Sequence, residues 1–316
     1  MKIFDARELS DVHYDVLYDL IKNRIDAGIK NLCISWFGGE PLLKHKELLK
    51  FSSKVMDLVD LKNINFVGGM TTNGVVLDTE IFNKLVSAGI RNYQITLDGF
   101  SHDKQRIFKG GRGSFDIIHK NIINILKTDI DFELVLRVNI SKKEFDFRFY
   151  DLFKEFVDDK RLIFLIKAIE RWSDKEIEIP IFKSANEATK EIKKHHAYIK
   201  EMGLKLYAAE KEGFLCFSCH AASPSYYVIR GDGTICKCTV VLGDDINSIG
   251  RINLNNKNLE IDEHKMRRWT DMPINQECRT CSLLYKCFNR ACPLARIKYG
   301  NDSCTVFNSL RDRNEV

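Results

Sequence analysis

The stretch that decides the fold runs from Ile29 to Pro41 and reads IKNLCISWFGGEP. Its first part is rich in apolar residues and predicts a strand over residues 29–37. Two glycines, a glutamate and a proline then form a turn that lets a ligand approach the backbone closely. Taken alone, this loop is more readily explained as a tight turn with an exposed Glu40.

Strands and helices alternate strictly along the next 130 or so residues. Apolar runs predict five strands, at residues 29–37, 64–71, 93–97, 132–140 and 162–169. Amphipathic patterns predict a helix before the first strand, ended by Gly28, and one in each gap between strands, the last over 144–157. This alternation predicts an α/β fold with a parallel sheet, either a barrel or an open doubly wound sheet. A further helix is predicted over 184–202, with His195 and His196 on a solvated face.

Length and composition exclude several classes of protein. The 316 residues fit one large domain plus a small one, and 44% hydrophobic residues can bury a sizeable core. A net charge of +5 is mild, so we expect no nucleic-acid partner. No apolar run reaches the roughly 20 residues that span a bilayer, and the first residues do not resemble a signal peptide. We therefore expect a cytoplasmic protein in a reducing compartment, without membrane partners.

Nine of the ten cysteines lie in the last third of the chain. They are Cys216, Cys219, Cys236, Cys238, Cys278, Cys281, Cys287, Cys292 and Cys304. Eight thiolates suffice for two four-ligand sites, and C-x2-C spacing favours iron–sulfur clusters or zinc over calcium or magnesium. The segment SYYVIRGDGTICKC, residues 225–238, predicts a β-hairpin that brings Cys236 back towards Cys216 and Cys219.

Polar and glycine-rich segments follow the predicted strands. They are Gly38-Gly39-Glu40-Pro41, Thr71-Thr72-Asn73-Gly74, Asp98-Gly99, and the pair Arg137 and Asn139. Since the carboxyl ends of parallel strands meet at one rim, we expect these segments to form a ligand site together.

In these motifs, the chain resembles the radical S-adenosylmethionine (AdoMet) enzymes that carry a C-terminal SPASM domain. That family includes anaerobic sulfatase-maturing enzymes and peptide maturases. The resemblance rests on GGEP at 38–41, TNG at 72–74, Gly231-x4-Cys236, and C-x2-C-x5-C-x4-C from Cys278 to Cys292. It implies a parallel partial (β/α) barrel over 1–170, a bridging segment over 171–212 and a small cysteine-rich SPASM-type domain over 213–316.

The resemblance also implies site residues. Those expected to bind AdoMet are Gly38, Gly39, Glu40, Pro41, Thr72, Asn73, Asp98, Arg137 and Asn139. Two auxiliary 4Fe–4S clusters are implied, one held by Cys216, Cys219, Cys236 and Cys292, the other by Cys278, Cys281, Cys287 and Cys304. Four residues precede Cys292 where the family usually has three, and Cys238 is left over and can replace a neighbour.

The implied activity is modification of a peptide or protein side chain through a 5′-deoxyadenosyl radical, with a flavodoxin- or ferredoxin-type electron donor. One departure bears on it: the family's C-x3-C-x2-C run is missing, and only Cys33 precedes Cys216. We interpret Cys33 as core packing and expect the missing cysteines and a sixth strand to lie upstream of Met1. The chain as written is then inactive, or active only with that segment restored.

Two other hypotheses stay open. One is a catalytically incomplete paralogue or fragment that keeps the clusters and binds a peptide or partner. The other is a zinc-binding module, because four-cysteine sites also suit zinc. No catalytic acid or base is identified; His102, Asp103 and Glu170 are candidates by position alone, and each is expected to be an ordinary surface residue.

Overall fold

A computed structural model describes residues 8–104, 106, 110–169, 180–207, 219–274, 276–282, 284–287 and 291–300. The chain divides into two compact units. One is Arg24–Tyr207, and the other combines Met1–Asn23 with Ala208–Val316.

The unit Arg24–Tyr207 is built on a parallel sheet in the order β1-β2-β3-β4-β5. Its strands are β1 Asn31–Trp36, β2 Asn65–Thr72, β3 Ile90–Thr96, β4 Glu133–Ile140 and β5 Leu162–Ala168. The prediction of an α/β fold with five parallel strands is confirmed. Sequential strands lie side by side because each helical connection is short and un-knotted.

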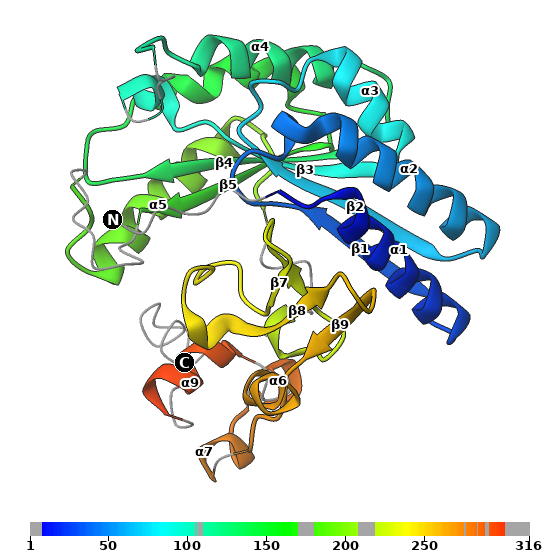
Figure 1. Ribbon diagram of the computed structural model, residues 1–316. Helices are drawn as coiled ribbons and strands as arrows, with labels where there is room; N and C mark the ends of the chain where they lie inside the picture. The colour runs from blue at the N-terminus through cyan, green and yellow to red at the C-terminus, as the bar shows by residue number, and fades with distance from the viewer. Residues whose placement is uncertain are drawn as a thin grey trace. The chain divides into compact units, whose positions relative to one another are not determined.

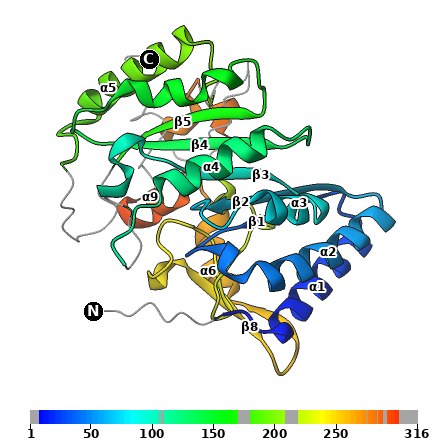
Figure 2. The same ribbon diagram turned by 90° about the horizontal axis from the view of Figure 1, so that it is seen from above.

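The connecting helices cover one face of this sheet. Figure 1 shows α2 His45–Leu61, α3 Thr79–Ser87 and α4 Phe115–Leu126 on the same side, and Figure 2 shows them lying across the strands. In β4, Leu134, Leu136 and Val138 belong to the core beneath the helices, while the alternate residues are more exposed. Helices on one face are typical of a barrel and not of a doubly wound sheet.

Three shorter elements connect to the sheet, and one differs from the prediction. The 3₁₀-helices η1 Pro41–Lys44 and η2 Gly99–Lys104 follow β1 and β3. The predicted α-helix over 144–157 is instead the 3₁₀-helix η3 Phe147–Phe156. Four of its five aromatic residues recur every third position, at 147, 150, 153 and 156, which matches the three residues per turn of a 3₁₀-helix; the fifth, Phe149, lies outside this period and is buried.

The predicted helix over 184–202 is α5 Ala185–Glu201, capped by Ser184. The expectation that His195 lies on a solvated face is wrong, because its exposed fraction is 0%. Its ring packs between Phe145 and Phe147, and its Nδ1 lies 2.6 Å from the Tyr150 hydroxyl oxygen. Burial lowers the pKa of His195 to about 4. His195 is thus part of the aromatic core.

The second unit contains the predicted hairpin, here β6 Val228–Ile229 and β7 Thr234–Cys236, extended by β8 Ser248–Asn253 and β9 Asn258–Ile261 into an antiparallel sheet. Its other elements are η4 His220–Ala222, η5 Asp245–Asn247, α6 Glu263–Thr270, α7 Gln276–Arg279, α8 Leu284–Cys287 and α9 Pro293–Tyr299. The helix α1 Asp11–Asp26 begins in this unit, since Val16 packs in one core with Ile235, Ile249 and Trp269. The compact units therefore place residues 1–23 with the C-terminal segment. The domains predicted from the motifs instead divide the chain into 1–170, 171–212 and 213–316.

Candidate cofactor and metal sites

Glu40 connects the loop after β1 to the loop after β2. Its Oε1 accepts hydrogen bonds from the Thr72 hydroxyl at 2.6 Å and from the backbone N–H of Leu42 at 3.0 Å. Its Oε2 accepts from the backbone N–H of Asn73 at 2.7 Å. Glu40 is therefore half-buried and bonded, not the exposed turn residue that GGEP alone suggested, and it brings two predicted cofactor motifs together.

Gly38 and Gly39 shape the loop in front of Glu40. Their φ angles are +93° and +47°, in the region that side chains with a Cβ rarely adopt. A Cβ built on either glycine would meet no atom within 4 Å. These glycines are thus required by the backbone conformation, and the space beside them is open to a ligand.

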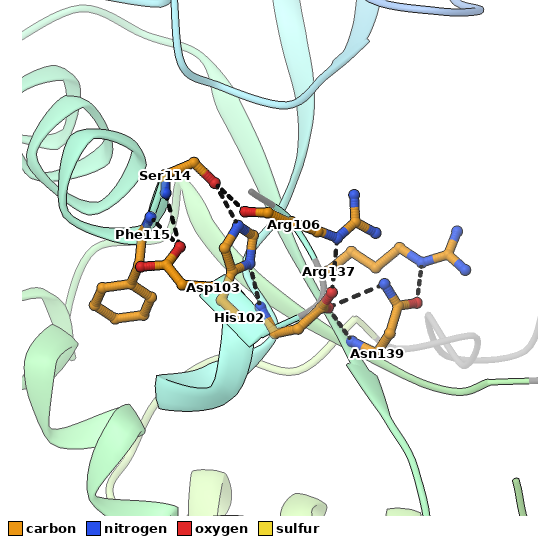
Figure 3. Close-up of polar contacts among 8 residues, drawn as sticks. His102, Asp103, Arg106, Ser114, Phe115, Arg137 and Asn139 are labelled. Carbon is orange, nitrogen blue, oxygen red and sulfur yellow. Dashed lines mark hydrogen bonds and ion pairs between the residues drawn. The ribbon is translucent and has the colours of Figure 1, made fainter. Parts of the chain in front are cut away.

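Asp98 follows β3 and is the hub of a polar cluster that includes Arg106 and, from β4, Arg137 and Asn139; Figure 3 labels these three residues. Only 4% of it is exposed. Its Oδ1 accepts from the backbone N–H and the side-chain amide of Asn139, at 2.8 and 3.0 Å, and its Oδ2 accepts from Nε of Arg106 at 2.9 Å. Asn139 in turn accepts from Nε of Arg137 at 2.8 Å. The predicted residues Asp98, Arg137 and Asn139 therefore lie together.

This cluster holds more positive than negative charge. Burial lowers the pKa of Arg137, the Asp98 carboxylate raises it, and the neighbouring Arg106 lowers it. Both arginines use Nε for these contacts, and within the described part of the chain neither terminal amino group has a hydrogen-bond partner. Figure 3 shows both guanidinium groups extending towards the same side. Two cations around one carboxylate leave room for an external anion, which guanidinium groups bind bidentately.

His102, Asp103 and Ser114 support this cluster. Asp103 accepts from the backbone N–H groups of Ser114 and Phe115, at 2.7 and 2.9 Å, at the start of α4. The His102 ring accepts from the backbone N–H of Asp98 at 3.2 Å and lies 3.1 Å from the Ser114 hydroxyl. The expectation that His102 is a surface residue is wrong, because 1% of it is exposed. Glu170, the third candidate, lies outside the described residues.

In the second unit, Cys219 lies near two other thiols. Burial raises the pKa of Cys219, and the thiols of Cys292 and Cys238 raise it further. The loop of Cys238 is well fixed: the amide oxygen of buried Asn247 accepts from its backbone N–H at 2.8 Å, and Val240 N–H donates to its Sγ at 3.4 Å. Cys236 ends β7 and is buried, which raises its pKa to about 11.

The other predicted cysteine site is described less completely. Arg296 donates to Sγ of Cys278 at 3.7 Å, and the backbone N–H of Cys281 donates to the carbonyl of Cys278 at 3.2 Å. Cys216 and Cys304 lie outside the described residues. Among the residues that are described, no three His, Cys, Asp or Glu side chains are arranged to hold one metal ion. The donor chemistry nevertheless fits thiolate ligation, since several thiols are grouped, and an N–H···S bond and nearby cations favour the thiolate.

Comparison with known proteins points to one family. Residues 7–154 match the model of the radical SAM superfamily. The chain carries a radical SAM domain. A cysteine-type anaerobic sulfatase-maturating enzyme of Clostridium novyi (strain NT) is 25% identical over 166 residues, or 51% of this chain and 42% of that enzyme. The alignment thus spans less than half of the relative's length.

Two solved structures share the fold at lower identity. The structure of native anSMEcpe with bound AdoMet and Kp18Cys peptide has a TM-score of 0.64 and 17% identity, covering 96% of this chain and 87% of that chain. The crystal structure of Streptococcus suis SuiB has a TM-score of 0.55 and 14% identity, and the match covers 90% of this chain and 68% of that chain. These likenesses confirm the parallel α/β fold expected of the radical SAM domain.

Two residues beside the predicted sites, Arg106 and Lys237, carry no recognisable signal in the sequence. Arg106 follows η2 and lies eight residues beyond Asp98 in the sequence. It is not at the end of a strand, so the expectation that site residues follow strands does not identify it. Its hydrogen bond to Asp98 in the radical SAM domain does identify it. Lys237, between two cysteines, has an exposed fraction of 0%, where a lysine would be expected at the surface.

No described helix is long and apolar enough to cross a membrane.

Proposed function

We propose that this chain serves a radical SAM reaction on a peptide or protein side chain, with AdoMet bound at the strand rim. When bound, AdoMet and its 4Fe–4S cluster supply a 5′-deoxyadenosyl radical that abstracts a substrate hydrogen. Support for a peptide substrate comes from the anSMEcpe structure, which contains a bound peptide. An electron donor of the flavodoxin or ferredoxin type is part of the proposal.

The observation that carries the cofactor site is the charge distribution at the rim. AdoMet carries an ammonium and a carboxylate on its methionine part. The guanidinium groups of Arg137 and Arg106 suit the carboxylate, because one carboxylate, Asp98, offsets only one of their two charges. Backbone carbonyls of the Gly38–Gly39 loop, which has open space beside it, can accept hydrogen bonds from the ammonium. Glu40 and Thr72 hold these loops together.

For the auxiliary clusters we propose the two predicted groups of cysteines, with one revision. Cys238 joins Cys219, Cys292 and Cys216 in the first site, because its thiol neighbours Cys219 and its Sγ already accepts an N–H bond. Cys278, Cys281, Cys287 and Cys304 hold the second. The cytoplasmic location and the lack of nucleic-acid and membrane partners remain predictions.

Titration calorimetry with AdoMet tests the rim. Arg137→Met is expected to bind at least about tenfold more weakly than the unsubstituted chain, since a hydrogen bond to a charged group contributes about 1.5–3 kcal/mol. Arg148→Met is the matched control, because Arg148 pairs with Asp146 on the exposed surface of the same unit. Equal affinities for both variants would refute the proposed cofactor site.

Activity is a separate measurement. The printed sequence has no C-x3-C-x2-C run, so we expect this chain alone to bind AdoMet and to form no 5′-deoxyadenosine with dithionite. The same preparation, reconstituted anaerobically, should be brown and hold about eight irons per chain. A colourless, zinc-loaded protein would favour the zinc-binding module. Peptide binding without AdoMet binding would favour the catalytically incomplete paralogue.

A further inference from the structure

Two cations lie in the interior of the second unit, and both adjoin cysteines. Lys237 is 0% exposed and Arg296 is 4% exposed. Within the described part of the chain, no other lysine or arginine is buried to this extent. An ion moved from water into a protein interior costs several kcal/mol unless an opposite charge or a full set of hydrogen bonds compensates it.

The contacts of Lys237 leave its charge uncompensated. Its Nζ donates to the carbonyls of Ser223 and Tyr226, at 2.5 and 2.6 Å, and lies 5.6 Å from the ring centroid of Tyr227. Within the described residues it forms no ion pair with a carboxylate. The ionisable group that interacts electrostatically with its ammonium is the Cys219 thiol.

Arg296 has the same arrangement at the other group of cysteines. It donates to Sγ of Cys278 at 3.7 Å and to the carbonyl of Pro273 at 3.4 Å. Its Nε is buried and has no hydrogen-bond partner among the residues that the structure describes. No described carboxylate forms an ion pair with it. In the described part of the second unit, each of the two cysteine groups therefore adjoins one buried cation that forms no ion pair with a carboxylate.

We propose that Lys237 and Arg296 are the charge partners of two anionic thiolate–iron centres, one cation for each centre. This inference rests on the proposed auxiliary clusters and adds the residues that set their charge balance. Reduction adds one negative charge to a cluster, and a buried cation beside its thiolates favours that charge. Lys237 and Arg296 thus raise the reduction potential of their respective clusters and act as positioning residues for the cysteine loops.

A redox titration of the anaerobically reconstituted full chain tests this, with the clusters followed by electron paramagnetic resonance. Lys237→Met is expected to lower the reduced fraction of one cluster by at least about tenfold at a fixed potential, which is the effect of one charge about 12 Å away through an effective dielectric constant near 20. Arg296→Met is expected to do the same to the other cluster. Lys265→Met and Arg267→Met, exposed positions on α6, are matched controls that should leave both potentials unchanged.

The outcomes separate the two proposals. A chain that takes up no iron refutes the proposed clusters. A Lys237→Met or Arg296→Met variant that holds its full iron content and has unchanged reduction potentials refutes the charge-partner inference. The inference is also refuted if both variants shift the potential of the same cluster. If a methionine variant fails to load iron, the charge-conserving variant at the same position, Lys237→Arg or Arg296→Lys, is measured. Iron content restored by the charge-conserving variant supports a role of the charge. Loss of iron in the methionine variant and in the charge-conserving variant overturns that role.

Discussion

Asp98 shows how much depends on one buried carboxylate. Both oxygens are occupied by donors from Asn139 and Arg106, and a neutral amide at this position would turn an N–H₂ group towards one of these donors. About half of the Arg106 side chain is exposed to solvent. Removing the charge of Asp98 is therefore expected to destabilise the protein less than breaking a fully buried ion pair would.

Asp98→Asn is expected to reduce the free energy of unfolding by about 2–3 kcal/mol, from the lost charge pair and a mismatched donor. Urea denaturation followed by circular dichroism measures the change. Asp146→Asn removes a carboxylate from an exposed pair with Arg148 in the same unit and should cost far less. A similar loss in both variants would contradict the role of Asp98 as a buried hub.

His195 makes stability depend on pH. Burial lowers its folded-state pKa to about 4, whereas the unfolded chain binds the proton near pH 6.5. The unfolded state therefore holds more protons between these values, and stability falls as the pH drops below about 6.5. At pH 5 we expect a loss of about 2 kcal/mol relative to pH 8 from this residue.

Urea denaturation at pH 5 and pH 8 checks this contribution by difference. His195→Gln should flatten the pH dependence, because glutamine can keep a contact with the Tyr150 hydroxyl without gaining a charge. His264→Gln, at an exposed position of α6, should leave it as steep as in the unsubstituted chain. An unchanged slope in His195→Gln would count against a neutral buried ring.

At the scale of elements, the loop after β1 depends on backbone conformation. Gly38→Ala is expected to cost about 1–2 kcal/mol, because a residue with a Cβ is strained at a φ of +93° although nothing crowds it. Gly110→Ala is the matched control: the space around it is equally open and its φ is ordinary. Urea denaturation of both variants measures the difference, and equal stabilities would refute the strain.

The same elements show what sequence patterns can predict. All five strands were expected within about three residues of their observed ends, since buried parallel strands read as apolar runs. GGEP and TNG were expected at one rim, and Glu40 joins them. The burial of His195 and the proximity of Arg106 to Asp98 could not be predicted, because each depends on tertiary packing that no local period encodes. The form of η3 is a different case: aromatic residues at 147, 150, 153 and 156 carry a period of three, which the prediction of an α-helix overlooked.

At the scale of the whole molecule, the two units should respond differently to iron. Metal bound by thiolates stabilises only the unit that supplies them. In hydrogen exchange measured by mass spectrometry, peptides from residues 219–274 are expected to exchange more slowly after reconstitution. Peptides from β3 and β4 should not change and serve as the internal control. Equal slowing in both units would contradict separate stabilisation.

The surplus cation beside Asp98 also has a practical consequence. A fork of two guanidinium groups attracts any small oxyanion, so sulfate or phosphate in a buffer competes with the carboxylate of AdoMet for the same position. Affinities measured in phosphate buffer will understate those in a buffer without such ions. The choice of counter-ion thus belongs among the variables that any assay of this protein has to control.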